Sequence, residues 1–174
     1  MKKRAVLILI LIIFFTSAAA VSAAELSSVK YLISGDASDV DTLQLEPEFS
    51  LNESADAVLN LAFDGDDFHF GAGVGVNVLS QEELEIDLHM MLSDQVNNED
   101  FGKAVGLSVE TKNSDLNFYW ITYYFIDDKI DDHAYYRGGF EYRLGPSSYL
   151  DLSIGNKYWD LSDDLINFGI KMDL

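Results

Sequence analysis

The sequence lacks cysteine entirely and is poor in proline and in basic residues. Without cysteine, the fold has no disulfide framework, and lipid attachment to a cysteine after an export signal is excluded. The 11 Lys and Arg residues stand against 30 Asp and Glu, for a net charge of −19. This charge argues against nucleic acid and anionic lipid as electrostatic partners, and it is compatible with divalent cations, cationic partners or a saline habitat.

The first 24 residues have the pattern of a secretory signal peptide. A basic start (Met1 to Arg4) is followed by an apolar run from Ala5 to Phe15 and by small residues ending at Ala24. We expect cleavage after Ala24 or after Ala23. The alternative is an uncleaved helical anchor, for which the apolar run is short. The mature chain, residues 25–174, would be a single domain carrying eight basic and thirty acidic residues.

Alternation of apolar and polar residues dominates the mature chain. From Phe68 to Val78, Phe, Ala and Val alternate with His, Gly and Asn. Because strand side chains point to opposite faces with a period of two, this segment predicts a strand with one apolar face. The pattern recurs and predicts ten strands: Val29–Gly35, Thr42–Leu51, Ala57–Phe63, Phe68–Leu79, Leu84–Leu92, Ala104–Thr111, Leu116–Ile126, Ala134–Leu144, Tyr149–Tyr158 and Leu165–Leu174.

The connections predict an all-β, antiparallel, up-and-down transmembrane β-barrel. Short connections alternate with longer ones, as the periplasmic turns and external loops of outer-membrane barrels do. Ten strands fit this rhythm, and eight are the alternative if the first segments are irregular. Pro47 lies inside the second segment and predicts a bulge there.

The composition of the two faces favours a membrane barrel. One face is nearly continuous Leu, Ile, Val and Phe, and the other carries Gly, Ser, Asn and charges of both signs, which suits a crowded lumen. The expected location is the bacterial outer membrane. The alternative is an exported soluble, lipocalin-like barrel that binds an apolar ligand. Aromatic residues near strand ends suggest interfacial girdles: Tyr123, Tyr124, Tyr135, Tyr136, Tyr149, Tyr158 and Trp159.

Several segments resemble the YfaZ-type family of outer-membrane proteins. They are Asp64 to Asp67 with the glycine-alternating strand after it, Gly102 to Leu107, Phe118 to Trp120, and Tyr158 to Ser162. The resemblance spans roughly residues 57 to 174 and implies an outer-membrane barrel, with no catalytic or binding residues to carry over. Such proteins usually end on an aromatic residue that the barrel-insertion machinery reads. This chain ends on Leu174, so we expect insertion with a weakened signal.

Charged residues on the polar faces predict a lumen network. Buried charges must pair, and neighbouring strands of a barrel offer partners across the lumen. The predicted network consists of Glu85, Asp87, Arg137, Glu141, Arg143 and Lys171. It is either a polar plug that closes the lumen or the lining of a narrow, porin-like pore with a weak preference for cations.

The longer connections carry many acids and predict an acidic external rim. Clustered carboxylates could bind Ca²⁺ or another divalent cation, and the candidates are Asp64, Asp66, Asp67, Asp127 and Asp128. The alternative is a solvated loop surface in which Asp serves as a turn residue, with no cofactor at all. The expected partners are outer-membrane lipid and the insertion machinery, and we expect a monomer.

We do not expect an enzyme. Asp131, Asp132 and His133 form a loop cluster, and His69 and His89 face the predicted lumen, where a His–Asp pair could activate water. However, no Ser lies in a nucleophile motif, and the predicted loops are too short to form a substrate cleft. Residues 119–125, apolar on both faces, could instead line a hydrophobic cavity.

Overall fold

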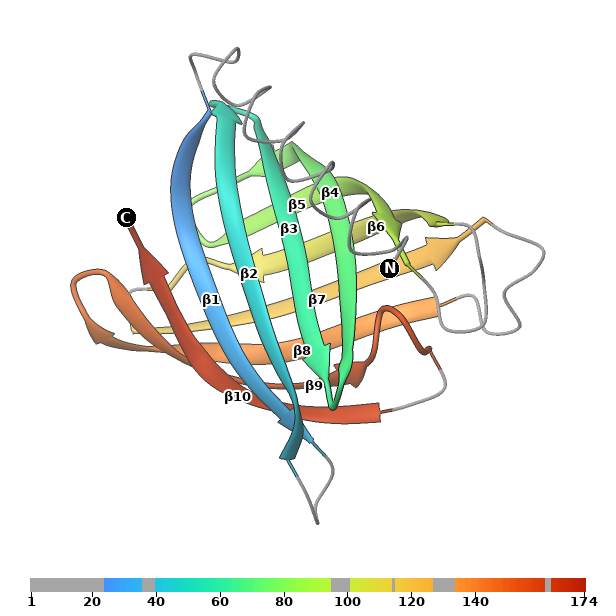
Figure 1. Ribbon diagram of the computed structural model, residues 1–174. Helices are drawn as coiled ribbons and strands as arrows, with labels where there is room; N and C mark the ends of the chain where they lie inside the picture. Colours follow the sequence, from blue (N-terminus) through green and yellow to red (C-terminus); the bar gives the residue numbers. More distant parts are fainter. Residues whose placement is uncertain (1–23, 36–39, 95–100, 114, 127–133, 162–163) are drawn as a thin grey trace.

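The protein is described from a computed structural model that defines residues 24–35, 40–94, 101–113, 115–126, 134–161 and 164–174. The expected signal peptide therefore lies outside the described residues, apart from Ala24. The described chain forms a closed barrel of ten antiparallel strands (Figure 1). The strands are β1 (Glu25–Gly35), β2 (Val40–Asn52), β3 (Ala55–Asp64), β4 (Asp67–Ser80), β5 (Leu84–Ser93), β6 (Gly102–Thr111), β7 (Leu116–Phe125), β8 (Ala134–Gly145), β9 (Ser148–Asn156) and β10 (Asp164–Asp173).

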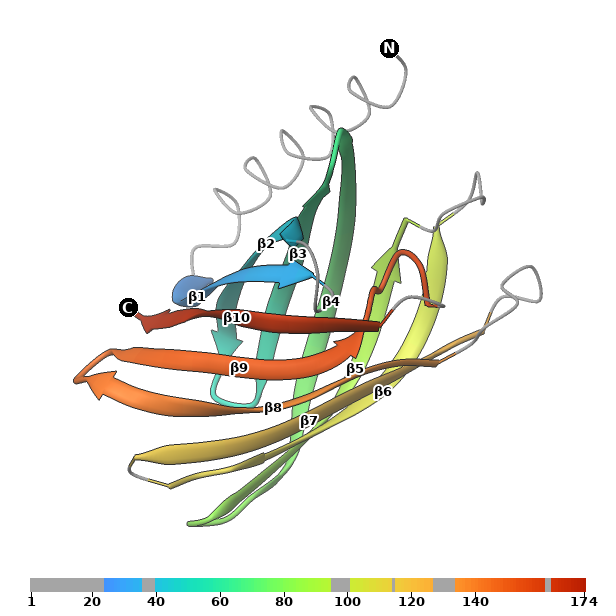
Figure 2. The same ribbon diagram turned by 90° about the horizontal axis from the view of Figure 1, so that it is seen from below.

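The barrel closes through its first and last strands. Consecutive strands pair as hairpins, and β1 pairs with β10, with Ile33 opposite Phe168 and Val29 opposite Met172. The predicted ten-stranded topology is confirmed, and the eight-stranded alternative is wrong. The β2–β3, β4–β5, β6–β7 and β8–β9 turns lie at the same end as the start of β1 and the end of β10. We call this the short-turn end and the opposite one the long-loop end (Figure 2).

The outer surface of the barrel is apolar. In β4 the outward residues Val74, Val76 and Val78 are 38%, 45% and 53% exposed, while Gly71 and Gly75 on the inner face are buried. The other strands repeat this division, with exposed residues that include Ile33, Leu43, Leu88, Met90, Leu92, Val105, Ile154, Ile166, Phe168 and Ile170. A closed sheet leaves no unpaired backbone, and a continuous apolar exterior suits hydrocarbon, so the fold is a transmembrane β-barrel.

The described residues contain no helix that is long and apolar enough to cross a membrane.

Glycines on the inner face make room for large side chains inside the barrel. At Gly106, an added Cβ would lie 2.5 Å from the carbonyl oxygen of Thr122 and would also overlap the ring of Tyr123. Glycine here lets an aromatic side chain lie flat against the barrel wall.

Two local expectations are wrong. Pro47 itself lies opposite Val29 in regular pairing, and the β2–β3 register is the same before it, at Leu45, and after it, at Glu48. The nearby irregularity is on β1, between Leu26 and Ser28. The lost proline N–H thus removes a donor without shifting the register. The expected aromatic girdle is also divided between the two faces. Tyr124 points outward and is 57% exposed, whereas the interior holds Tyr123, Tyr135, Tyr158 and Trp159.

Candidate functional site

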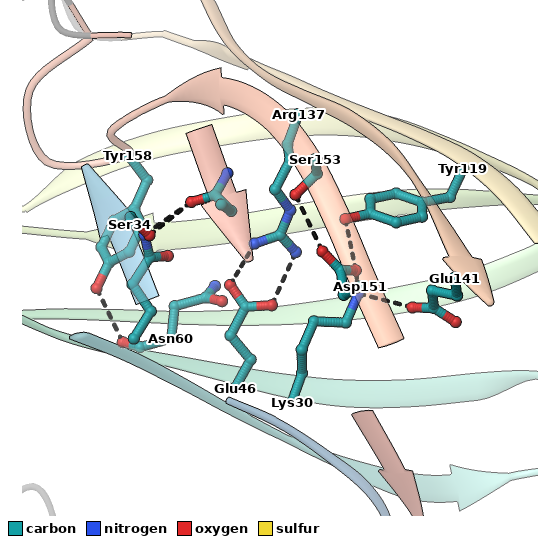
Figure 3. Close-up of polar contacts among 12 residues, drawn as sticks. Lys30, Ser34, Glu46, Asn60, Tyr119, Arg137, Glu141, Asp151, Ser153 and Tyr158 are labelled. Carbon is teal, nitrogen blue, oxygen red and sulfur yellow. Dashed lines mark hydrogen bonds and ion pairs between the residues drawn. The ribbon is translucent and has the colours of Figure 1, made fainter. Parts of the chain in front are cut away.

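The middle of the barrel holds a cluster of charged side chains, which we call the charged cluster: Lys30, Glu46, Arg137, Glu141, Asp151 and Lys171. These residues come from β1, β2, β8, β9 and β10. Figure 3 shows all of them except Lys171, which contacts Glu141. Asp151 is fully buried, and Glu141 is 3% exposed. The alternation of each strand places these charges on the inner face, where ion pairs replace water.

One ion pair of the charged cluster joins distant walls of the barrel. Arg137 Nη1 and Nη2 on β8 donate to the two carboxylate oxygens of Glu46 on β2, at 2.6 and 2.7 Å. Three strands separate β8 from β2 along one side of the barrel and five along the other. This bidentate pair therefore crosses the lumen, in the planar geometry that an arginine and a carboxylate favour.

A second group of contacts surrounds Lys30. Its Nζ donates to Glu141 Oε1 at 2.7 Å and to Asp151 Oδ2 at 2.8 Å. Asp151 also accepts hydrogen bonds from the hydroxyls of Tyr119 and Ser153. Lys171 Nζ bonds the second oxygen of Glu141 at 3.1 Å. Each buried carboxylate in this group thus has several donors, which is what a charge needs inside a protein.

The structure brings together half of the predicted lumen residues. Arg137, Glu141 and Lys171 belong to the charged cluster. Glu85 binds Lys112 near the short-turn end, where the side chains are 29% and 42% exposed. Arg143 is exposed there and donates to the carbonyls of its own turn, at Gly145 and Pro146.

Asp87 lies apart from the charged cluster, in a polar group on the wall formed by β4, β5 and β6. It accepts hydrogen bonds from Asn77 Nδ2 at 2.8 Å and from Ser108 Oγ at 3.1 Å, and His89 Nε2 lies 2.7 Å from the same hydroxyl. Because that hydroxyl has one proton and Asp87 accepts it, His89 donates to Ser108. In a catalytic triad the histidine accepts the proton of the nucleophile, and a carboxylate orients the histidine. Here Ser108 donates to Asp87, and among the described residues no carboxylate orients His89, so the group differs from a triad.

The predicted lumen network does not include Lys30, the cation that binds both Glu141 and Asp151. Its segment reads Ser28, Lys30, Leu32 and Ser34 on one face, all of which are buried in the structure. The same alternation that identified the other lumen residues could have found it. Tyr119 was placed on a generally apolar strand, although its hydroxyl bonds Asp151.

Aromatic residues fill the lumen toward the long-loop end. We call this group the aromatic cap: Tyr123, Phe125, Tyr135, Tyr158, Trp159 and Leu161, which form one hydrophobic cluster with Ala62, Met91 and Ala104. Phe125 and Trp159 are 0% and 1% exposed. Tyr158 and Trp159 come from the β9–β10 connection, which Figure 2 shows arching from the end of β9. The predicted strand Tyr149–Tyr158 therefore ends earlier, at Asn156, and the residues after it fold into the lumen.

Specific hydrogen bonds hold this connection across the barrel. Tyr158 donates to the carbonyl of Asn60 on β3 at 3.1 Å. Lys157 Nζ and Trp159 Nε1 both reach Asp64 Oδ2, at 3.0 and 3.3 Å. Asp64, predicted as a rim acid and metal candidate, therefore anchors the aromatic cap to β3.

Of the other metal candidates, two lie within the described residues and two do not. Asp66, in the β3–β4 turn, and Asp67, the first residue of β4, are exposed, and Asp127 and Asp128 lie outside the described residues. Within the part of the chain that the structure describes, no group of three or more His, Asp or Glu residues is placed to hold a metal ion.

No protein-family model matches the chain. No curated protein matches it either. Among solved structures, a triple mutant of the Rhodopseudomonas blastica porin is 13% identical with a TM-score of 0.43, over 91% of this chain and 58% of the porin. A protein described under "Asymmetric conductivity of engineered proteins" is 13% identical with a TM-score of 0.44, over 85% and 52%. A structure described as "De novo design of transmembrane beta-barrels" is 14% identical with a TM-score of 0.38, over 86% and 98%. The chain spans about half the length of the porin chains it matches.

Proposed function

We propose that this protein is an integral outer-membrane β-barrel with a closed lumen and a structural rather than a conducting role. The bidentate pair of Arg137 and Glu46 carries the proposal, because it crosses the lumen between distant walls. The aromatic cap supports it, since Trp159 and Phe125 fill the long-loop end with almost no exposed surface. Two layers of different chemistry therefore obstruct the path of an ion.

The proposed setting follows the sequence expectations. The chain would be exported by the signal peptide and inserted as a monomer, with its long loops and acidic rim facing outward. Membership of the YfaZ-type family is part of the proposal and rests on the resembling segments. The exposed apolar belt argues against the soluble, lipocalin-like alternative, because a water-soluble barrel turns its apolar face inward.

Planar-bilayer recording tests the closed lumen. The refolded wild-type barrel should give no conductance steps, whereas the quadruple variant Glu46→Ala, Arg137→Ala, Tyr158→Ala, Trp159→Ala should give small ones. Removing both partners of the ion pair avoids leaving a buried charge unpaired. A heat-dependent shift in gel mobility would show that each protein is folded. Steps from the wild-type barrel would refute the proposal.

Carbonate extraction of cell envelopes tests the membrane assignment separately. An integral barrel stays with the membrane fraction, and a soluble barrel is released. The protein should remain in the pellet and dissolve only in detergent. Release by carbonate would favour the soluble alternative.

A further inference from the structure

The lumen contains a cavity next to the charged cluster. Its volume is about 160 Å³, and its lining comes from β1, β2, β3, β5, β6, β7, β8 and β10, with Tyr158 of the aromatic cap. An engineered cavity of about 150 Å³ in another protein holds a benzene molecule. The cavity in this barrel therefore has room for a ligand with a single small ring, and its walls contain both polar and apolar groups.

The charges that line the cavity do not balance. Each lining Lys or Arg residue is already bound to a carboxylate of the charged cluster. Glu48 and Glu110 line the same cavity, and neither forms an ion pair within the described residues. Glu48 accepts one hydrogen bond, from Ser28, and Glu110 makes no side-chain hydrogen bond or ion pair there. With Asp87, the lining therefore contains five carboxyl groups and three cationic side chains.

Two buried tyrosines that line the cavity have hydroxyl groups without a hydrogen-bond partner among the described residues. Tyr123 and Tyr135 are 5% and 6% exposed, and both line the cavity. Within the described residues neither hydroxyl makes a hydrogen bond. Neither hydroxyl oxygen belongs to the side-chain atoms there that lack both a hydrogen-bond partner and accessible surface. Their oxygens thus keep accessible surface inside residues that are otherwise buried. Buried Tyr hydroxyls usually have a hydrogen-bond partner, so these two are free to bind a ligand.

We propose that this cavity is a binding site for a small organic cation, meaning an ammonium group on a short apolar body. Glu48 and Glu110 would receive the ammonium, and the hydroxyls of Tyr123 and Tyr135 would accept or donate further hydrogen bonds. Val58, Met91 and Ile121 also line the cavity and would contact the apolar body. An anion would face uncompensated carboxylates, which disfavours it.

The ligand would enter from the short-turn end. At the long-loop end the aromatic cap closes the lumen, with Trp159 at 1% exposure. Toward the short-turn end the inward side chains are more accessible: Glu48, Glu110 and Lys171 are half-buried, whereas Glu46 and Arg137 are buried. The cavity is thus a pocket with one approach, and ligand binding does not require conduction through the barrel.

Calorimetric titration of the wild-type barrel in detergent tests the ligand class. Three probes share one ring and differ in charge: benzylammonium, benzyl alcohol and benzoate. Benzylammonium should bind at least about tenfold more tightly than benzyl alcohol, the range of a charge-assisted hydrogen bond, and benzoate should not bind. Equal affinity for the amine and the alcohol, preference for benzoate, or no binding of benzylammonium would overturn the proposal.

Variants locate the site. Glu48→Gln and Glu110→Gln keep the shape and remove the charge, so each should weaken benzylammonium binding at least about tenfold and leave benzyl alcohol unchanged. Asp173→Asn is the matched control, because Asp173 lies opposite Ser28 at the same end but does not line the cavity. Unchanged affinity in both Gln variants, or an equal loss in the control, would place the site elsewhere. The wild-type probe comparison remains decisive if a variant does not fold.

Discussion

The imidazole of His69 lies flat against the indole of Trp159, with ring centroids 4.9 Å apart and planes 8° apart. His69 is on β4 and Trp159 is in the β9–β10 connection, so this stack joins distant walls of the barrel. His69 Nδ1 is also 3.2 Å from Asp94 Oδ2. The ring that closes the lumen is therefore held by the β3–β4 hairpin, through its stacking on His69 and its hydrogen bond to Asp64.

The two tryptophans of the chain should report opposite faces of the barrel. Trp120 on β7 points outward and is 47% exposed, whereas Trp159 is 1% exposed in the interior. In vesicles containing brominated lipid, the Trp159→Phe variant, which keeps Trp120, should be strongly quenched. The Trp120→Phe variant, which keeps Trp159, should be quenched little. Equal quenching of the two would contradict the assignment of the faces.

Replacing one glycine at the β1–β10 pairing should prevent closure. In Gly169→Ala the new Cβ would overlap the carbonyl of Tyr31 on β1, and backbone atoms cannot move aside. We expect a destabilisation of about 3 kcal/mol or loss of the folded, heat-shifted gel band. Gly71→Ala is the control, because its nearest contact, at 2.9 Å, is the flexible methyl end of Met91. If both variants fold equally well, the predicted steric block is absent.

Loss of Lys30 should be far more damaging than loss of a surface lysine. In Lys30→Met, Glu141 keeps only Lys171, and the fully buried Asp151 keeps only hydroxyl donors, so we expect a loss of about 3–5 kcal/mol. Lys112→Met removes an ion pair whose lysine is 42% exposed and should cost about 0–1 kcal/mol. Urea unfolding in detergent measures the free energy of unfolding of both variants. Similar losses in the two would show that the charged cluster does not stabilise the barrel.

A disulfide can test the register at closure directly, because the chain has no native cysteine. Ile33 and Phe168 are paired across β1 and β10 and both point outward. The double variant Ile33→Cys, Phe168→Cys should therefore cross-link on oxidation. Ile33→Cys with Met172→Cys should not, since Met172 pairs with Val29, about 13 Å further along the strand. The reverse result would mean a shifted register.

The strands could be predicted from the sequence because their physical signal is local. A barrel strand in a membrane has lipid on one side and polar neighbours on the other, so each residue of β4 between Phe68 and Val78 records the face it occupies. The same signal places Arg137, Glu141 and Lys171 in the lumen. It does not reveal which charge pairs with which, because that depends on strands that lie far apart in the sequence.

The aromatic cap could not be predicted in this way. Tyr158 and Trp159 follow the last alternating residues of β9, where a girdle residue and an inward-folded residue look alike in sequence. Their position depends on Asn60 and Asp64, almost a hundred residues earlier. Asp64 was predicted at the rim for the same reason: a turn acid shows no sign of a distant partner.

The closing pair of strands has a consequence for folding. Every other pairing joins neighbours in sequence, whereas β1 and β10 bring together Ser28 and Asp173. Sheet growth can proceed by successive hairpins, but the final pairing has to overcome the loop entropy of nearly the whole chain. Until then the sheet has two open edges, each able to pair with another chain. Closure is therefore the step at which folding competes with aggregation.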